Sequence, residues 1–384
     1  MPPMTRTDPS IDQTAADSDK RFMALALALS RRALGNAWPN PAVGAVLVRD
    51  ENGEPIVVGR GWTQPGGRPH AEAEAIRRAG AAAHGATLYV TLEPCSHHGK
   101  TPPCADAIIA AGITRVVSAL EDPNHEVAGR GHARLRAAGI AVRIGTGAAE
   151  AAHAHAGHIR RMREKRPTVT LKLAMSADGK AGLAGRRPAA ITGERARDRV
   201  HLLRAMNDAI LVGIGTALAD DPVLTCRLPG MADRSPVRVV FDASLRLPRD
   251  GRLVTSVKDA PLWVVTAHSA PAHREQALRA RSVEVLRVEI SAPGRLDLGA
   301  ALRLLADRGI TRLLVEGGPV LASAMIACDL VDEVALFQAS ARIGPEGIDA
   351  LEGMPMSALT RSQRFKSVGA ESLGADRLET FVRA

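Results

Sequence analysis

Apolar positions along this chain recur at two spacings, one typical of helices and one typical of strands. The first helical stretch is predicted over residues 20–34, where it begins after Asp19 and ends at Gly35. An apolar strand is expected over 43–48, and strand and helix patterns then alternate up to residue 144. Such alternation is typical of a three-layer α/β domain, in which helices cover both faces of a sheet.

A charged stretch over residues 159–167 separates this region from a second series of strands and helices. The first strand of that series, over 169–173, alternates apolar and polar residues, so Thr170 and Lys172 are expected to face outward. Helices are predicted over 194–206 and 298–307. Further strands are expected at 209–213, 237–241, 262–266, 283–288, 312–315, 333–337 and 378–382.

These patterns divide the chain into three parts. Residues 1–19 are polar and are predicted to form a disordered tail. Residues 20–160 form one predicted domain and residues 167–384 a second, both of the α/β class. A length of 384 residues is compatible with two domains of ordinary size.

Composition narrows the class of protein. Hydrophobic residues make up 46% of the chain and charged residues 24%, as in soluble globular proteins. The first 20 residues lack the order of a secretory signal, and the apolar run 22–29 is too short to span a bilayer. Four cysteines in a chain of this length do not make a disulfide framework. We therefore expect a cytoplasmic protein that has no membrane partner.

The net charge of +9 admits a phosphorylated ligand or a nucleic acid. No dense block of Lys and Arg is interleaved with aromatic residues, which make up only 2% of the chain. We therefore expect no nucleic-acid partner and attribute the charge mainly to an arginine-rich surface.

A set of metal-binding residue types lies in the first half. His70, Cys95 and Cys104 supply one imidazole and two thiols, and three such ligands leave a fourth zinc position open for water. Glu72 follows His70 too closely to be a second ligand, but it is well placed to move protons beside the metal. The alternative is a solvated His–Glu pair with two structural cysteines. Eight residues separate the two cysteines, more than in common zinc deaminases, which favours a particular subfamily.

Other candidate sites are weaker. His153, His155 and His158 do not share one helix face, and we expect them at the surface. Glycine-bearing segments follow predicted strands at 212–216 and 315–321, where backbone N–H groups can hold phosphate or simply form tight turns. Neither has the spacing of a dinucleotide-binding fingerprint.

Taken together, the chain from about residue 20 resembles the bifunctional deaminase–reductase family of riboflavin biosynthesis. In the first half the resemblance rests on Pro39-Asn40-Pro41, His70-Ala71-Glu72, the run from Thr91 to Cys104, and Asp122-Pro123-Asn124. In the second half it rests on Lys172-Leu173-Ala174, Ser176, Asp178-Gly179, the run from Ala219 to Thr225, and Glu316-Gly317-Gly318.

The resemblance implies a cytidine-deaminase-like domain followed by a domain similar to dihydrofolate reductase. The first would remove the 2-amino group of 2,5-diamino-6-(5-phosphoribosylamino)pyrimidin-4-one, with zinc bound and Glu72 as acid and base. The second would use NADPH to reduce the ribosyl group to ribityl. The expected partner is this phosphorylated pyrimidine, and a homo-oligomer is compatible with the sequence.

The resemblance also implies site residues in the second half. Those expected at the cofactor are Ala174, Thr216, Asp220, Ser244, Gly318, Pro319, Val320, Leu321, Ala322, Ser323 and Ala324. Those expected at the substrate are Arg204, Leu224, Arg227 and Glu316, together with Asn40 at the deaminase substrate.

The chain departs from the family pattern at three places. Pro188-Ala189-Ala190 stands where the family usually has Ser-x-Trp. Ala243 stands where the family has a serine, although the next residue here is Ser244. His125 stands where proline is usual. These departures predict altered cofactor contacts. The alternative function is a zinc deaminase of another base whose C-terminal domain binds a nucleotide without catalysis.

Overall fold

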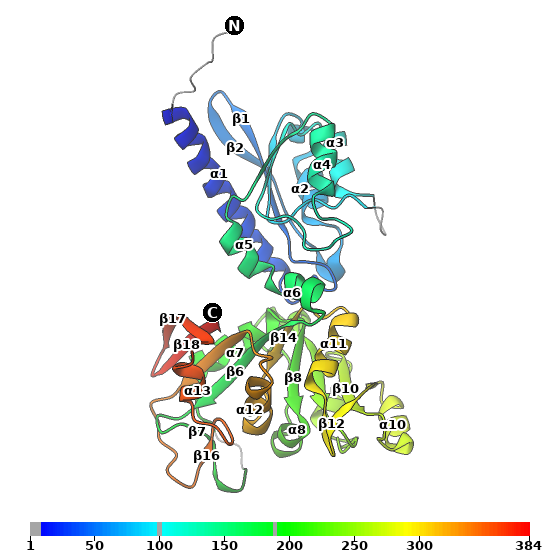
Figure 1. Cartoon of the computed structure of the whole chain (residues 1–384), viewed down its shortest axis with the longest axis vertical. Coiled ribbons are helices and arrows are strands. Elements are labelled where there is room, and N and C mark those ends of the chain that lie inside the picture. Colours follow the sequence, from blue (N-terminus) through cyan, green and yellow to red (C-terminus); the bar gives the residue numbers. More distant parts are fainter. Residues whose placement is uncertain (1–8, 98–101, 187–189) are drawn as a thin grey trace. The chain divides into compact units, whose positions relative to one another are not determined.

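The computed structural model describes residues 9–97, 102–186 and 190–384 (Figure 1). They form two compact units that divide between Glu164 and Lys165, inside the charged stretch 159–167. Helices and strands alternate in both units around separate sheets, so the predicted α/β fold class is confirmed.

The first unit is built on a five-stranded sheet with the order β2-β1-β3-β4-β5. β1 pairs antiparallel with β2 and β3, whereas β3, β4 and β5 run parallel to one another. The strands are β1 Gly44–Glu51, β2 Glu54–Trp62, β3 Thr87–Val90, β4 Arg115–Ser118 and β5 Ala141–Ile144. Because β3 and β4 are parallel, the segments that follow them leave the sheet at the same edge.

Helices cover both faces of this sheet (Figure 1). They are α1 Pro9–Ser30, α2 Ala71–Ala79, α3 Cys104–Ala110, α4 Arg130–Ala137, α5 Ala148–Ala154 and α6 Ala156–Glu164, with short 3-10 turns at Arg31–Ala33, Pro65–Gly67 and Gly80–Ala83. Ala75, Ile108 and Leu135 from α2, α3 and α4 are buried on one face. On the other, Phe22 of α1 packs on Tyr89 with ring centroids 5.3 Å apart.

Asp19 does not begin the first helix, contrary to the prediction. α1 already begins at Pro9, so the predicted tail over 1–19 is wrong for residues 9–19, and residues 1–8 lie outside the described part of the chain. Asp19 is buried, and its carboxylate accepts hydrogen bonds from the Tyr89 hydroxyl at 2.9 Å and from Arg115 at 2.6 and 2.8 Å. Arg143 adds a contact at 3.1 Å. These partners lie far along the chain, so no local pattern could reveal them.

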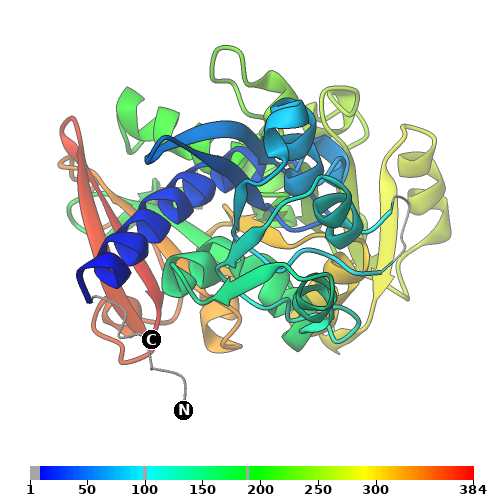
Figure 2. The ribbon, with the colours of Figure 1, turned by 90° about the horizontal axis from the view of Figure 1, so that it is seen from above.

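The second unit contains a nine-stranded sheet with the order β11-β10-β9-β8-β14-β6-β15-β18-β17. The strands from β11 to β15 in this order are parallel, and β18 and β17 are antiparallel. Figure 2 shows the red β17–β18 hairpin on one side and yellow-green strands on the other. The strands are β6 Thr168–Met175, β8 Ala209–Gly213, β9 Val237–Phe241, β10 Leu262–Ala267, β11 Glu284–Val288, β14 Arg312–Val315, β15 Glu333–Gln338, β17 Phe365–Leu373 and β18 Asp376–Arg383.

The helices of the second unit alternate with these strands along the chain. They are α7 Glu194–Ala205, α8 Ile214–Asp220, α9 Arg252–Thr255, α10 Ala272–Arg279, α11 Leu298–Asp307, α12 Pro319–Ala327 and α13 Ser357–Thr360. Two small ladders join β7 Lys180–Gly182 to β16 Ile348–Asp349 and β12 Ile290–Ala292 to β13 Arg295–Leu296. The predicted helices 194–206 and 298–307 are confirmed as α7 and α11.

The prediction that β6 has one exposed face is wrong. β6 lies between β14 and β15 in the middle of the sheet, and a central parallel strand is covered on both faces. Thr170 is buried and donates a hydrogen bond from its hydroxyl to Glu333 at 2.9 Å. Lys172 is partly buried, and this burial lowers the pKa of its ammonium group.

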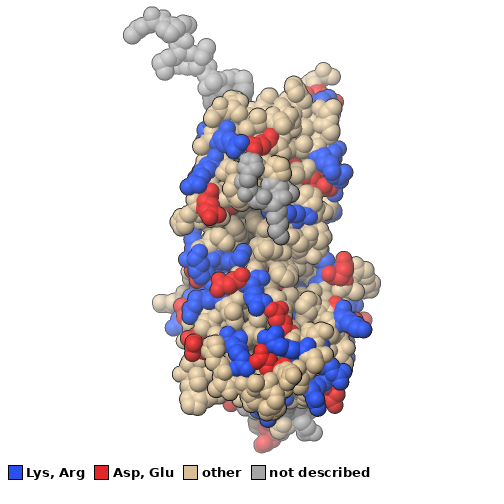
Figure 3. Space-filling view, turned by 90° about the vertical axis from the view of Figure 1, so that its right-hand side faces the viewer, with Lys and Arg blue, Asp and Glu red and all other residues tan. Residues whose placement is uncertain are grey.

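Basic and acidic side chains are interspersed over the face in Figure 3, which agrees with an arginine-rich surface rather than one basic field. Among the described helices, none combines the length and the apolar character that a bilayer crossing requires.

We predict that Asp19→Asn destabilises the first unit by about 3 kcal/mol, because loss of a buried anion leaves its arginine partners without a counter-charge. Urea unfolding, followed through Tyr89 as the only tyrosine of the chain, measures this loss. Asp17→Asn is the matched control, since its pair with Lys20 is exposed and is expected to contribute less than about 1 kcal/mol. Equal losses in both variants would contradict a structural role for the buried carboxylate.

Candidate active sites

The structure brings the three predicted metal ligands together. His70 immediately precedes α2, Cys95 follows β3, and Cys104 is the first residue of α3. Nδ1 of His70 lies 3.7 Å from Sγ of Cys95 and 3.3 Å from Sγ of Cys104. All three donor atoms lie within 4.8 Å of one another.

This donor set fits a tetrahedral zinc ion. Zinc–ligand bonds of about 2.0 to 2.3 Å place neighbouring donors about 3.6 Å apart, close to the separations seen here. The backbone N–H of Cys104 also donates to Sγ of Cys95 at 3.3 Å. The hydrogen bond from the Cys104 thiol lowers the pKa of Cys95 to about 4, and the same contact, with burial, raises the pKa of Cys104. The site therefore already favours a thiolate, the form that binds metal.

Glu72 lies beside this centre on the first turn of α2. Its carboxyl group is buried, and burial raises the pKa of Glu72 to about 7. A carboxyl with a pKa near the working pH can both accept and donate a proton. Glu72 and His70 face a cavity of about 190 Å³, which Asn40, Asp122 and His158 also line.

Asn40 contacts the predicted metal ligand as well as the cavity. Its Nδ2 atom lies 2.9 Å from the carbonyl oxygen of Gly67 and 3.2 Å from Nε2 of His70. Gly67 has φ +86°, and a Cβ there would lie 2.8 Å from the Asn40 amide. The Asn40 amide and the Gly67 backbone therefore lie against the edge of the imidazole ring.

Two histidines that the sequence analysis placed at the surface are buried. Nε2 of His158 lies 3.0 Å from the carboxylate of Asp122, and Nε2 of His155 lies 3.0 Å from the hydroxyl of Thr91. The prediction was wrong for these two because α5 ends and α6 begins around His155, so helical spacing does not continue across them. His153 is exposed, as predicted.

In the second unit, a buried ion pair lies where β14 ends. Arg204 donates to both carboxylate oxygens of Glu316, from Nε at 2.8 Å and from Nη2 at 2.9 Å. Its Nη1 donates to the carbonyl oxygen of Thr225 at 3.1 Å, so the guanidinium also fixes the loop that contains Leu224. Arg204 lowers the pKa of Glu316 although burial opposes this.

Lys172 also belongs to this group of charges, although it was not among the predicted site residues. The charges of Glu316, Arg204 and Asp220 all act on its ammonium group. Burial raises the pKa of Asp220, and Lys172 opposes that shift. Its place in the segment Lys172-Leu173-Ala174, on which the family resemblance rests, is the signal that could have identified it.

The remaining predicted residues lie on several elements of the sheet edge. The Thr216 hydroxyl accepts a hydrogen bond from the backbone N–H of Gly318 at 3.0 Å, which joins α8 to the start of α12. Leu224 is buried with φ +61°, an uncommon backbone conformation for leucine. Arg227 is exposed. Ala174 lies in β6 and is partly buried. The run Gly318 to Ala324 forms the first turns of α12.

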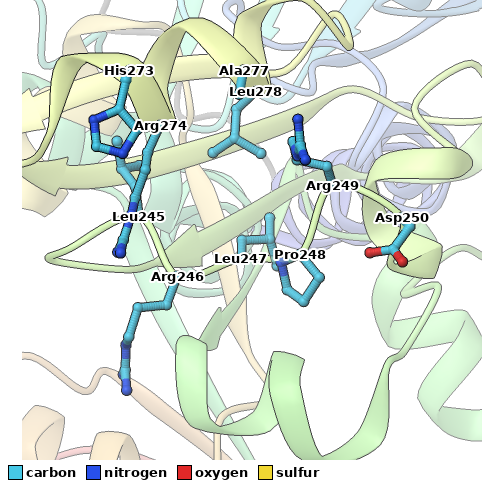
Figure 4. Close-up of a pocket in the computed structure, with 10 residues that line it drawn as sticks. All are labelled: Leu245, Arg246, Leu247, Pro248, Arg249, Asp250, His273, Arg274, Ala277 and Leu278. Atoms are coloured by element: carbon cyan, nitrogen blue, oxygen red, sulfur yellow. The ribbon is translucent and has the colours of Figure 1, made fainter.

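Ser244 lies beside a larger cavity of about 650 Å³ (Figure 4). The cavity lies after β9 and beside α10. Leu247 and Pro248 are among its apolar lining residues, and its charged lining residues are Arg246, Arg249, Arg274 and Asp250. Arg274 donates to the carbonyl oxygen of Ser244 at 3.1 Å. Pro188 and Ala189, where the chain departs from the family pattern, lie outside the described residues, as do residues 98–101 of the cysteine loop.

Comparisons with known proteins bear on both units. Residues 16–120 match the cytidine and deoxycytidylate deaminase zinc-binding region, and residues 167–378 match the RibD C-terminal domain. The riboflavin biosynthesis protein RibD of Escherichia coli (strain K12) is 40% identical over 363 residues, which cover 91% of this chain and 96% of that protein. The RibD of Aquifex aeolicus (strain VF5) is 36% identical over 365 residues, covering 95% and 98%.

Solved structures agree with these matches. RibD from Acinetobacter baumannii has a TM-score of 0.83 at 34% identity, covering 96% of this chain and 99% of that one. A Thermotoga maritima diaminohydroxyphosphoribosylaminopyrimidine deaminase/5-amino-6-(5-phosphoribosylamino)uracil reductase has a TM-score of 0.81 at 35% identity, covering 96% and 100%. The resemblance stated from the sequence is confirmed, and the chain belongs to the RibD family of riboflavin biosynthesis, which joins a zinc-binding deaminase domain to a reductase domain.

Proposed function

We propose that the first unit removes the 2-amino group of 2,5-diamino-6-(5-phosphoribosylamino)pyrimidin-4-one and releases ammonia. The observation that carries this proposal is the contact of His70 Nδ1 with both cysteine sulfurs next to the buried Glu72, inside one cavity. We infer that His70, Cys95 and Cys104 hold zinc, which when bound would supply an activated water at neutral pH.

The protein's own residues then orient the substrate and move protons. Glu72 would accept a proton from the attacking water and deliver protons to the ring nitrogen and the departing amine. Its short distance in sequence from His70, at the start of the same helix, keeps the carboxyl beside the metal without making it a ligand. Asn40, which lies beside the His70 ring and lines the same cavity, would present its amide to the pyrimidine edge.

For the second unit we propose NADPH-dependent reduction of the ribosyl group of the deaminated product to ribityl. NADPH would supply the hydride. Of residues 318–324, Gly318, Pro319 and Val320 would face the cofactor phosphates, because they form the accessible beginning of α12 and the beginning of a helix favours negative charge. Ala174, Thr216 and Asp220 would line the rest of the cofactor site. Lys172 would place a positive charge near Asp220 in this site.

We assign the substrate of this unit to the Glu316–Arg204 pair, Leu224 and Arg227. Arg204 already uses both ends of its guanidinium group on Glu316 and Thr225. The exposed Arg227 is therefore the better candidate for the substrate phosphate, since an arginine fork suits phosphate oxygens.

The basic cavity beside Ser244 would take the far end of the cofactor. β14, β8, β9 and β10 are successive parallel neighbours, and ligands of such sheets lie at the carboxyl ends of the strands. Strands about 4.8 Å apart place β10 about 14 Å from β14, a distance suited to an extended dinucleotide. Arg246, Arg249 and Arg274 would meet the phosphate on its adenosine ribose.

We further infer a reducing, cytoplasmic setting, because a disulfide between Cys95 and Cys104 would remove two of the three metal ligands. All four cysteines are free in the structure. A homo-oligomer stays a prediction that sedimentation would test.

The proposal is tested by incubating purified protein with the diaminopyrimidine phosphate and NADPH, while ammonia and NADPH absorbance are followed. We predict that Glu72→Gln keeps its zinc but lowers the rate of ammonia release by at least about 10³-fold, because the amide cannot carry protons. Glu74→Gln on the same helix is the control, since Glu74 pairs with Arg77 and Arg78 away from the metal. Ammonia release without NADPH consumption would leave a deaminase alone, and near-normal release by Glu72→Gln would refute the proton role.

Metal content tests the proposed ligands. We predict that Cys104→Ser loses most of its zinc, because a hydroxyl is a far weaker ligand than a thiolate. Elemental analysis of folded protein should give about one zinc per chain for the wild type and for Cys226→Ser, whose sulfur is buried in the second unit. Full zinc in Cys104→Ser would exclude this ligand set.

Cofactor preference tests the basic cavity. We predict that Arg246→Ala raises the KM for NADPH about tenfold and leaves the KM for NADH unchanged, because only NADPH carries the ribose phosphate. Reductase kinetics with both cofactors measure the difference. Arg281→Ala, an exposed arginine outside this cavity, serves as the control. An equal change for NADPH and NADH would contradict a phosphate contact.

A further inference from the structure

Glu93 lies two residues before Cys95, and its side chain is fully buried. Each of its carboxylate oxygens accepts two hydrogen bonds from backbone N–H groups. The donors are Asp122 at 3.1 Å and Gly129 at 3.0 Å on one oxygen, and Gly131 at 2.8 Å and His132 at 3.2 Å on the other. All four belong to the segment 122–132, which joins β4 to the first turn of α4.

The same carboxylate belongs to a possible cation cluster, because ligand atoms of Glu93, Glu121 and His132 lie within 4.8 Å of one another. A metal there would compete with backbone N–H groups that already occupy both oxygens of Glu93. Buried N–H groups that lose their acceptors are costly, so the carboxylate is better suited to hold the segment than to bind an ion. The start of α4 further favours a negative charge at this place.

Segment 122–132 also contacts the loop that bears Pro94 and Cys95 directly. A Cβ on Gly131 would lie 2.0 Å from the carbonyl oxygen of Pro94, so the two backbones meet at a distance that only glycine permits. Asp122, Asn124 and Val127 of this segment line the same cavity as His70 and Glu72, and Glu93 also belongs to its lining. Glu93 therefore links the wall of the cavity to the loop that bears Cys95.

We propose that Glu93 is a positioning residue of the deaminase, which fixes segment 122–132 against the metal-binding loop and so sets the width of the substrate cavity. The inference rests on the proposed deaminase function. Glu93 acts through the residues that it holds and does not itself contact the reacting atoms.

Glu93→Gln in the full-length, zinc-loaded protein tests this role. The amide has nearly the same size, but its NH₂ group faces two of the N–H donors and cannot accept from them. We expect the KM for the diaminopyrimidine phosphate to rise about tenfold, with zinc content and reductase rate unchanged. Hydrogen exchange of the backbone N–H groups of 122–132 should become faster. A purely structural role would lower the amount of active protein and leave the KM of the remaining molecules unchanged.

Glu121→Gln is the matched control, since this exposed carboxylate lies next to the same segment and should leave KM and exchange as in the wild type. Gly131→Ala is a second test, because the added methyl pushes the segment away from Pro94 and should also raise KM. An unchanged KM, unchanged exchange or loss of zinc in Glu93→Gln would overturn the proposal, as would an unchanged KM in Gly131→Ala. Absence of ammonia release from the wild type would instead remove the proposed deaminase function, and the exchange rates would still decide the role of Glu93.

Discussion

The first unit depends on backbones that approach one another more closely than side chains allow. A Cβ on Gly44 would lie 1.9 Å from the carbonyl oxygen of Ala26, and one on Gly61 would lie 2.1 Å from that of Ala71. The first contact seats α1 on β1, and the second seats the start of α2 on β2. Since His70 and Glu72 lie at the start of α2, the second contact sets their position. A chain with only 2% aromatic residues can build its layers in this way, because small residues let helices lie close to the sheet.

The second unit positions its polar groups by a different means. Its sheet is parallel from β11 to β15, so the segments that follow β6, β8, β9, β10 and β14 leave at one edge. Arg204 and Glu316 form a largely buried pair joined by two hydrogen bonds, and the partly buried Lys172 interacts with the charges of Glu316 and of the exposed Asp220. Each polar group would be costly to bury alone, and the pairing keeps them in a defined arrangement.

The α/β class, the three candidate metal ligands and Glu72 could be proposed from the sequence because the features that indicate them are local, and the structure confirms the class and brings the candidate ligands together. The metal-binding residue types within short motifs and the spacing of apolar residues can both be recognised in the sequence without knowledge of the fold. Asp19, His155 and His158 could not be assigned in this way. Their hydrogen-bond partners belong to strands and loops that are distant in the sequence. The residues before Asp19 are mostly polar and do not show the helical spacing of apolar residues by which a helix is predicted. Lys172 was predicted to face outward because alternating apolar and polar residues indicate a strand with one exposed face. β6 instead lies in the middle of the sheet, which the sequence pattern of this strand alone does not reveal.

Cys104 is at once the first residue of α3 and one of three converging donors, while His70 immediately precedes α2. An ion held by both would therefore tie two helix beginnings to the loop after β3 and act as a clamp on this corner of the sheet. Loading of the metal and ordering of the corner then become a single event, as in small metal-dependent domains. In a cell that lacks the ion, this corner of the domain would therefore lose its ordered structure at the same time as the deaminase activity is lost.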